Sequence, residues 1–237
     1  YYVPLVTWDN LSQHAEGLIA MTACFAGPVA SPIVHDRYDI AENNLKRLIE
    51  LFRDDLYIEL QPNSIDNQTK INTALYKLSK QYNVKYTIGV DAHYINKEDS
   101  LAQETLLGIN MKSLITDKPK HMDTGDNEEN ADDKKVRYRF SFEKHDFYLM
   151  TEEELYKMWD TNHKNIGIDD EPGEAPHVIV LMKAIENGKE LVSKIDEFDI
   201  YPDRSLMTIK YEISDEDKNN PEFVKFLERD KDKDQML

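Results

Sequence analysis

The chain has 237 residues, of which 40% are hydrophobic and 32% are charged, and its formal net charge at pH 7 is −17. This length and hydrophobic content favour one folded domain, or one domain with an appendage, over a disordered chain. Domains that bind nucleic acid through phosphate contacts are usually basic, so the acidic balance argues against direct DNA binding by this chain alone. The acidity could serve divalent metals, or simply solubility.

Cys24 is the single cysteine, so no intramolecular disulfide can form, and a reducing, cytoplasmic setting is expected. The sequence contains no run of about 18 apolar residues, which argues against a membrane-spanning helix. Its start also lacks the basic and apolar pattern of a signal peptide. The chain opens Tyr1-Tyr2-Val3-Pro4 without a methionine, and we expect further residues upstream, although a removed tag would leave the same start.

The predicted elements alternate between strands and helices in the first half of the chain. Asp39 and Glu42 are spaced like the capping box that begins many helices. Strands that alternate with helices at this spacing indicate parallel pairing with right-handed crossovers. The helix predicted over 98–113 has Leu101, Leu106 and Ile109 as its apolar positions. The periodicity predicts strands over 17–23, 56–61 and 85–91, and helices over 39–54, 66–82 and 98–113.

The character of the sequence changes after residue 115. Lys, Asp, Glu, Asn and Gly dominate residues 116–137, which predicts a flexible acidic loop. Residues 138–149 alternate apolar and polar side chains, as a hairpin or an edge strand would. Beyond them we expect a helix that begins with a capping box of Thr151 and Glu154, a long helix over 175–196, and a charged end over 228–237 that frays.

Asp91 and His93 follow the strand predicted at 85–91. In an extended segment, residues two apart point to the same side, so the carboxylate and the imidazole are expected to converge. Active sites of parallel α/β folds form at the carboxyl ends of strands. A carboxylate beside an imidazole suits Zn, Mn or Fe. The alternative interpretation is an aspartate that caps a turn beside a histidine satisfied by other hydrogen bonds.

Three further residues are candidates for the same site. Cys24 follows the strand at 17–23, and its thiolate would be a good zinc ligand, although a lone cysteine is usually a small buried hydrophobe. Adjacent parallel strands lie about 4.8 Å apart, so ligands on nearby strand ends could share one metal cluster. Glu59 could orient a metal ligand, or be a buried carboxylate paired with a basic side chain. His14, just before the first strand, is a weaker candidate for the supporting role.

Five segments of the chain, taken in order, resemble a known family. They are HAEGLIAMTACFAGPVA (14–30), LFRDDLYIELQPN (51–63), YTIGVDAHYINKED (86–99), FYLMTEEELYKMW (147–159) and KAIENGKELVSKIDEF (183–198). This order of segments is similar to that of the alpha subunit of bacterial DNA polymerase III, in its PHP (polymerase and histidinol phosphatase) domain. No Walker loop, HExxH motif or CxxC pair points to another class of enzyme.

The resemblance implies an α/β fold that is part of a distorted (β/α)7 barrel, with up to three divalent metals on its rim. Members with an intact site are metal-dependent phosphoesterases or 3′–5′ exonucleases, whereas in others the domain is structural and docks a proofreading exonuclease. By position, Cys24 matches a Cys-or-His ligand of the family, and Asp91 and His93 match its last two ligands. The family's first ligands are expected upstream of Tyr1, and the polymerase aspartates downstream of Leu237.

The resemblance also implies a domain organisation. Residues 1–115 would form the C-terminal half of the PHP barrel, 116–137 the acidic loop, and 138–237 the end of the PHP domain with a helical connection toward the polymerase core. The implied partners are the upstream and downstream parts of the polymerase, a proofreading exonuclease and the sliding clamp, with DNA bound only through a Mg-dependent parent polymerase and no membrane. Alone, the chain is expected to be inactive in DNA synthesis and to leave an open sheet edge. The alternative hypothesis outside this family is a small metal hydrolase with a barrel of its own.

Overall fold

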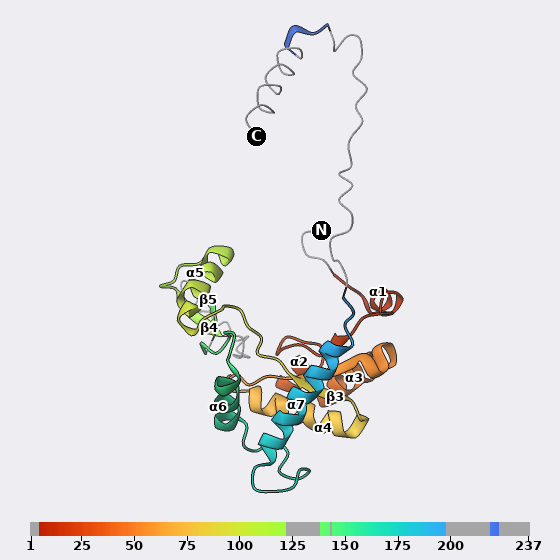
Figure 1. Cartoon of the computed structure of the whole chain (residues 1–237). Helices are drawn as coiled ribbons and strands as arrows, with labels where there is room; N and C mark the ends of the chain where they lie inside the picture. Colours follow the sequence, from red (N-terminus) through yellow and green to blue (C-terminus); the bar gives the residue numbers. More distant parts are fainter. Residues whose placement is uncertain (1–4, 122–137, 143, 198–218, 223–237) are drawn as a thin grey trace. The chain divides into compact units, whose positions relative to one another are not determined.

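The computed structural model describes residues 5–121, 138–142, 144–197 and 219–222 (Figure 1). The chain divides into two units, residues 1–195 and 196–237, and the second unit contributes only short described segments. No helix within the described ranges has both the length and the apolar character needed to cross a membrane. The elements of the first unit are α1 (Trp8–Gln13), β1 (Ala20–Met21), α2 (Ala30–Val34), α3 (Tyr38–Phe52), η1 (Arg53–Asp55), β2 (Leu56–Leu60), α4 (Gln68–Tyr82), β3 (Lys85–Ile88), η2 (Lys97–Asp99), α5 (Ser100–Met111), β4 (Lys118–His121), β5 (Tyr138–Ser141), α6 (Glu152–Asn162) and α7 (Pro176–Ser193).

A parallel sheet of three strands, in the order β1-β2-β3, organises the first unit. The ladder continues past the strand ends, since Thr22 N donates to Tyr57 O at 3.1 Å and Gly89 N donates to Leu60 O at 2.9 Å. The predicted α/β fold with parallel pairing is therefore confirmed. The described strands do not close into a barrel.

Two strands are shorter than the sequence predicts, because the backbone leaves the extended region. Ala23, just after β1, has φ +59°, and β1 is only two residues long. β3 ends at Ile88, three residues before the predicted end, and Asp91 has φ +48°. Such left-handed conformations turn the chain and end the ladder.

The helices lie close to their predicted positions, but one predicted start is wrong. α3 begins at Tyr38, with Arg37 in the N-cap position and no side-chain cap, so Asp39 and Glu42 form no capping box. Asp39 lies in the first turn instead, where a carboxylate interacts favourably with the helix dipole. The capping box of Thr151 and Glu154 is confirmed at the start of α6.

The second half of the first unit contains a two-stranded sheet of β4 and β5. β5 pairs in parallel with β4, and β4 lies within the predicted acidic loop. A parallel pair cannot be a hairpin, so of the two predicted alternatives for 138–149 the edge strand holds, over Tyr138–Ser141, and the hairpin does not. Residues 122–137 of the loop and the charged end at 228–237 lie outside the described residues.

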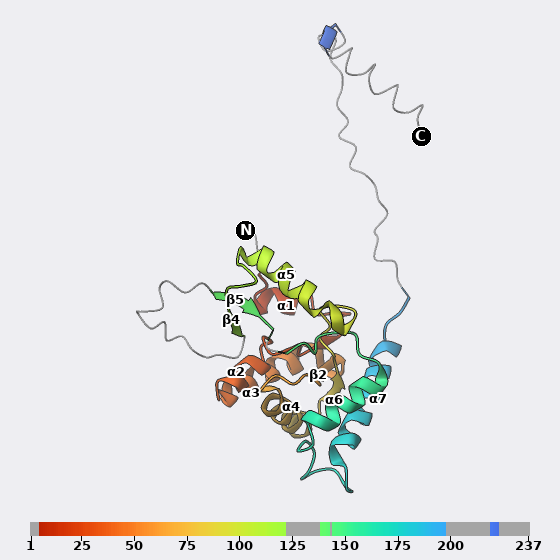
Figure 2. The same ribbon diagram turned by 90° about the vertical axis from the view of Figure 1, so that its left-hand side faces the viewer.

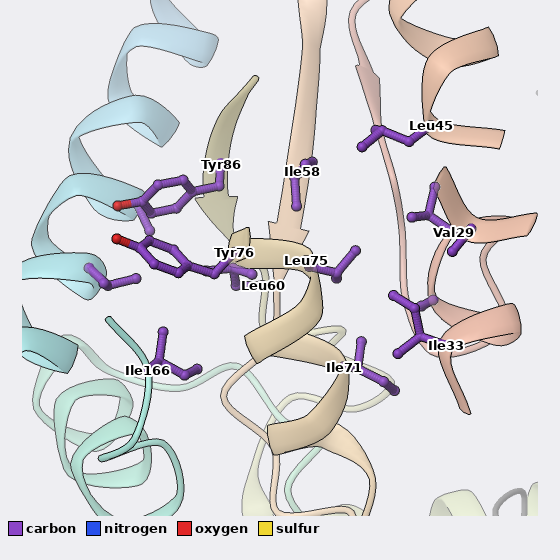
Figure 3. Packing of buried hydrophobic residues seen from close by; sticks show 14 of the residues in the cluster. Val29, Ile33, Leu45, Ile58, Leu60, Ile71, Leu75, Tyr76, Tyr86 and Ile166 are labelled. Atoms are coloured by element: carbon purple, nitrogen blue, oxygen red, sulfur yellow. The ribbon is translucent and has the colours of Figure 1, made fainter. Parts of the chain in front are cut away.

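The core fills the space between the sheet and its helices. Figure 3 shows it extending from Tyr86 and Ile166, across Leu75 on α4, to Ile33 and Leu45. Each fully buried aliphatic side chain contributes roughly 1.5–3 kcal/mol. Helices α3 and α4 bury the apolar side chains that recur at helical spacing, Leu45, Leu48, Phe52, Ile71 and Leu75. The apolar positions named for the helix over 98–113 behave differently, since Leu101, Leu106 and Ile109 are exposed in α5.

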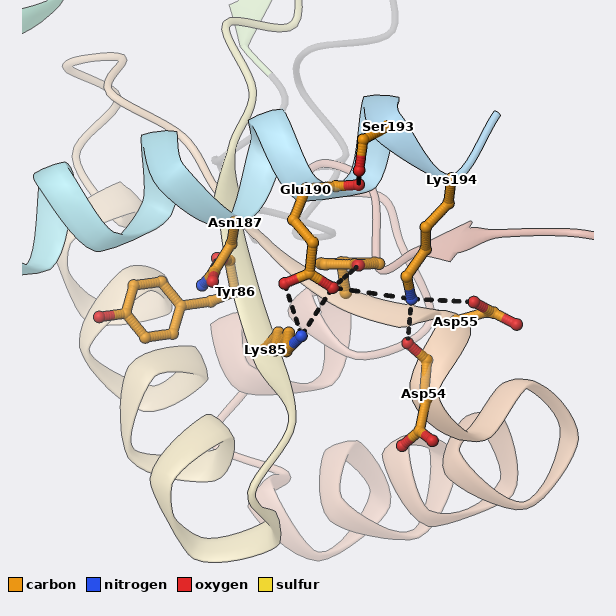
Figure 4. A network of polar contacts seen from close by, with 9 residues as sticks. Asp54, Asp55, Lys85, Tyr86, Asn187, Glu190, Ser193 and Lys194 are labelled. Atoms are coloured by element: carbon orange, nitrogen blue, oxygen red, sulfur yellow. Dashed lines mark hydrogen bonds and ion pairs between the residues drawn. The ribbon is translucent and has the colours of Figure 1, made fainter. Parts of the chain in front are cut away.

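Helix α7 covers part of the free edge of β3 (Figure 4). Because Gly89 N bonds to β2, the alternation of a parallel strand turns the backbone of Tyr86 away from β2. Asn187 Nδ2 donates to this exposed Tyr86 carbonyl at 2.7 Å. A Cβ at Gly188 would lie 2.9 Å from Thr87 Oγ1, so a glycine allows the close approach. The edge expected to be open is therefore partly closed by a helix.

Glu171 joins α4 to α7 through a nearly buried carboxylate. It accepts hydrogen bonds from Tyr76 Oη at 2.9 Å, from Lys80 Nζ at 3.3 Å and from Lys183 Nζ at 2.9 Å. Its side chain is 5% exposed, whereas the two lysines are about half exposed. Burial by itself would raise the pKa of Glu171, but the hydrogen bonds from Lys183, Tyr76 and Lys80 outweigh it and hold that pKa below 4.5.

Replacing Glu171 with glutamine should lower the free energy of unfolding at pH 7 by about 1–3 kcal/mol, because two lysines lose their carboxylate while the side-chain volume stays the same. The folded pKa is depressed, so this contribution is present above pH 4.5 and is lost as pH falls through the folded value. Urea unfolding of both proteins at pH 7 and at pH 3 measures it. The exposed Glu174→Gln is the matched control, and equal losses in the two variants would contradict the account.

Candidate metal centre

The carboxyl ends of the three parallel strands carry polar groups on one rim of the sheet. β1 ends at Met21, one residue before Thr22. The hydroxyl of Thr22 then accepts a hydrogen bond from the backbone of the next strand, from Glu59 N to Thr22 Oγ1 at 2.9 Å. From β2 the rim continues through Gln61 and Asn63, both buried. β3 leads into the segment that contains Asp91 and His93. This is the rim that parallel α/β folds use for chemistry.

Asp91 and His93 lie together on this rim, but not for the reason the sequence suggested. The segment is not extended, since Asp91 has φ +48°. His93 N donates to Phe147 O at 2.8 Å, which holds the segment after the turn. Asp91 Oδ1 lies 3.5 Å from His93 Nε2, and both side chains are partly exposed, at 27% and 37%. The two predicted ligands therefore do converge.

The separation of these two atoms fits a shared metal ion. Zinc binds imidazole nitrogen and carboxylate oxygen at roughly 2.0–2.2 Å, and two tetrahedral ligands at that distance lie about 3.3–3.6 Å apart. The observed 3.5 Å between Asp91 Oδ1 and His93 Nε2 matches this value. A carboxylate with a neutral imidazole is also a donor set that Zn, Mn and Fe accept.

Two phenylalanines, which the sequence reasoning did not single out, fix the ring of His93. The ring centroid of Phe142 lies 4.7 Å from that of His93, and the ring centroid of Phe147 lies 5.7 Å from it. Phe147 is buried, so the imidazole is held against an apolar wall with its Nε2 toward Asp91. The alternating apolar pattern of residues 138–149 indicated a hairpin or an edge strand. It did not indicate that these phenylalanines would contact His93.

The side chain of Glu59 packs against Gly89, at the start of the segment that carries Asp91. A Cβ at Gly89 would lie 2.2 Å from Glu59 Oε1, so the carboxylate occupies the space that glycine leaves. Gln61 Nε2 donates to Glu59 Oε1 at 3.1 Å, and Asn63 Nδ2 donates in turn to Gln61 Oε1 at 3.2 Å. Burial raises the pKa of Glu59, the hydrogen bond from Gln61 lowers it, and the charge of Asp91 raises it further. Its role in orienting a ligand stays a prediction.

Cys24 and His14 do not join the pair. Cys24 is a free, half-buried thiol in the tight turn after β1, where Gly27 N donates to Cys24 O at 2.7 Å. Within the described part of the chain, no three His, Cys, Asp or Glu side chains are grouped so that they could hold a metal ion. His14 follows α1, and its Nδ1 lies 2.8 Å from Asn10 O, so that nitrogen is engaged locally.

His163, the residue that follows α6, contacts the turn after β2. Its Nε2 donates to Pro62 O at 3.2 Å, in the turn that follows β2, and its Nδ1 lies 3.4 Å from Thr69 Oγ1. Its ring packs against Trp159 at 4.6 Å. Burial lowers the pKa of His163 to about 4, although the hydrogen bond to Pro62 opposes that shift. The histidine is therefore neutral in the folded protein at pH 7.

The neutral state of His163 predicts a pH-dependent stability. Its pKa is about 4 in the folded protein and 6.5 in the reference state, so the unfolded chain binds the proton first as pH falls. Stability should be complete above pH 6.5 and fall by about 2–3 kcal/mol between pH 6.5 and 4. His163→Gln should lack this part of the loss in urea unfolding across that range, whereas the exposed His14→Gln should retain it. Identical pH profiles for wild type and His163→Gln would refute it.

Comparisons with known proteins agree with the order of segments in the sequence. The PHP domain family matches residues 1–63. DNA polymerase III subunit alpha of Aquifex aeolicus is 39% identical over 48% of the chain, that of Thermus aquaticus 31% over 67%, and that of Borreliella burgdorferi 28% over 84%. The chain spans only 10–14% of the length of these relatives.

Proposed function

We propose that this chain serves as the later part of a PHP domain within a replicative polymerase. The support is its similarity to the alpha subunits of bacterial DNA polymerase III and its match to the PHP domain family. In this proposal residues 1–115 and 138–237 fulfil the domain roles expected from the sequence, with 116–137 as the acidic loop. The protein works in the cytoplasm. DNA synthesis and DNA binding belong to other parts of the polymerase, since this chain carries a net charge of −17.

The proposed chemical role is half of a metal-dependent phosphoesterase site. The observation that carries it is the 3.5 Å separation between Asp91 Oδ1 and His93 Nε2, on the rim where strands β1 to β3 end. These two side chains would hold a Zn, Mn or Fe ion. Cys24, the third expected ligand, does not join the pair among the described residues, and its part in the site stays a prediction. Such an ion, when bound, polarises phosphate oxygens and lowers the pKa of a bound water.

Residues around the pair would prepare it for binding. Phe142 and Phe147 restrict the imidazole to one orientation, which lowers the entropy lost on binding. Glu59 would orient a ligand or a bound water through the space above Gly89. His14 is a weaker candidate for such support. The ligands still missing would come from other parts of the polymerase.

A structural module that docks a proofreading exonuclease, or another replisome chain, is the second candidate. The observation in its favour is that the described residues contain no group of three potential metal ligands. In that case Asp91 and His93 would be a polar pair at a protein–protein contact. The sliding clamp would be reached only through the parent polymerase.

Metal content separates the two candidates. The chain, purified within its polymerase, should contain at least about one Zn, Mn or Fe ion by elemental analysis, and Asp91→Ala or His93→Ala should remove it because each deletes a ligand. Asp66→Ala and His145→Ala change exposed residues of the same types and should leave the content intact. Less than about 0.2 ion per chain in the wild type, unchanged in the variants, would sink the metal-site proposal and favour the structural one.

A further inference from the structure

The carboxylate of Glu59 is held by contacts on two sides. On one side, Gly89 leaves the space that the carboxylate fills, because a Cβ at residue 89 would lie only 2.7 Å from Glu59 Cδ. On the other side, Gln61 Nε2 donates a hydrogen bond to Glu59 Oε1 at 3.1 Å. No described residue forms a hydrogen bond with the second oxygen, Glu59 Oε2. One oxygen is therefore fixed, and the other is left available.

Gln61 can direct its amide nitrogen at Glu59 because its other polar groups are occupied. Its side-chain oxygen accepts a hydrogen bond from Asn63 Nδ2 at 3.2 Å, so its nitrogen is turned toward Glu59. Its backbone is held by α4, which packs along β2 (Figure 2). Gln61 N donates to Asn72 Oδ1 at 3.2 Å, and Asn72 Nδ2 donates to Gln61 O at 2.6 Å. Gln61 and both asparagines are buried.

The side chain of Gln61 is not needed to complete the end of β2. Asn72 already satisfies both backbone groups of Gln61, so an apolar side chain at position 61 would fill the same space without burying an amide. Buried amides destabilise a fold unless they are hydrogen-bonded, and a fully bonded network holds its members in one arrangement. The charged group that this network holds is the carboxylate of Glu59. A role in orienting Glu59 explains the amide, whereas the end of the strand does not.

Glu59 brings a second carboxylate close to Asp91. Burial raises the pKa of Glu59, the hydrogen bond from Gln61 lowers it, and the charge of Asp91 raises it again, so the two carboxylates repel each other. Glu59 is not a ligand itself, because within the described part of the chain no third potential ligand is grouped with Asp91 and His93. A bound cation attracts both carboxylates. The position of Glu59 is thus unfavourable without a cation at the pair and favourable with one.

We infer that Gly89 and Gln61 are positioning residues of the candidate metal centre, which act by holding the Glu59 carboxylate beside the segment that carries Asp91. This inference rests on the proposed function, since it takes Asp91 and His93 to bind a metal ion. It deepens that function because it assigns a task to two residues that cannot be ligands. Gly89 provides the space for the carboxylate, and Gln61 provides its direction. Together they strengthen the attraction of the pair for a divalent cation.

Zn²⁺ affinity tests the inference, in the intact polymerase that contains this chain. Binding is measured by competition with a chromogenic chelator, and the site is identified as the one that Asp91→Ala removes. Gly89→Ala should weaken binding about tenfold, because the new methyl group displaces the flexible end of Glu59 while both ligands and every charge remain. Glu59→Gln and Gln61→Leu should weaken it to a similar degree. Gly108→Ala adds the same methyl group within α5 and should bind as tightly as wild type.

Double variants separate positioning from a merely structural role. Because Gly89 and Gln61 act through Glu59, adding Gly89→Ala or Gln61→Leu to Glu59→Gln should cause no further loss of Zn²⁺ affinity. Urea unfolding, measured in parallel, reports any loss of stability separately from affinity. Gln61 is buried, so Gly89→Ala carries the test if Gln61→Leu does not fold.

Two results would overturn the inference: Gly89→Ala binds Zn²⁺ as tightly as wild type, or the losses of affinity add in the double variants. In both cases the wild type still binds Zn²⁺ through Asp91, so the proposed metal site survives and only the positioning is refuted. If the wild type binds no Zn²⁺ that Asp91→Ala removes, the proposed metal site fails and the positioning with it.

Discussion

The parallel alignment of β1, β2 and β3 is the constraint on which the candidate site depends. Because all three strands run in one direction, their carboxyl ends reach the same rim, and the chain must leave that rim through turns. Those turns hold the polar groups: Thr22 bonds to the backbone of Glu59, and Asp91 adopts a left-handed conformation that brings it to His93. An antiparallel pairing would place alternate strand ends on opposite rims. Asp91 and His93 would then lie far from the polar groups that follow β2.

The remaining structure holds this rim in place from two sides. On one side, α7 contacts β3 through Asn187 and Gly188, and Glu171 ties α7 to α4. On the other side, His163 of α6 fixes the turn after β2 through Pro62. The contacts of Asn187 with Tyr86 and of His163 with Pro62 join residues 101 positions apart, and Glu171 lies 95 positions from Tyr76 but only 12 from Lys183. Most of this support therefore depends on tertiary structure. Removing one partner of these hydrogen bonds should lower the free energy of unfolding more than removing an exposed one, because most of the atoms involved are buried and would be left unpaired.

The periodicity of the sequence predicted the regular elements well, because strand and helix patterns are local. It predicted the parallel pairing, and the family resemblance is supported by the comparisons. Asp91 and His93 do lie together, but through a turn and not through the extended segment on which that prediction relied. β3 ends three residues before its predicted end, and the segment after the turn bonds to Phe147 O, a contact distant in sequence that no local pattern reveals. The exposure of Leu101, Leu106 and Ile109 on α5 was missed for a similar reason, since the side of this helix that packs is set by the contacts of Glu104 with Arg139 and with Phe142 N, which are distant in sequence. The positions of Cys24 and His14 away from the pair also depend on tertiary structure.

The central claim is that Asp91 and His93 bind one metal ion. Anomalous X-ray scattering at the Zn, Mn and Fe absorption edges, from crystals of the polymerase that contains this chain, tests it most directly. The account predicts one anomalous peak within about 2.0–2.2 Å of both Asp91 Oδ1 and His93 Nε2. The absence of a peak at this pair, with the two side chains still about 3.5 Å apart as they are here, would contradict the claim.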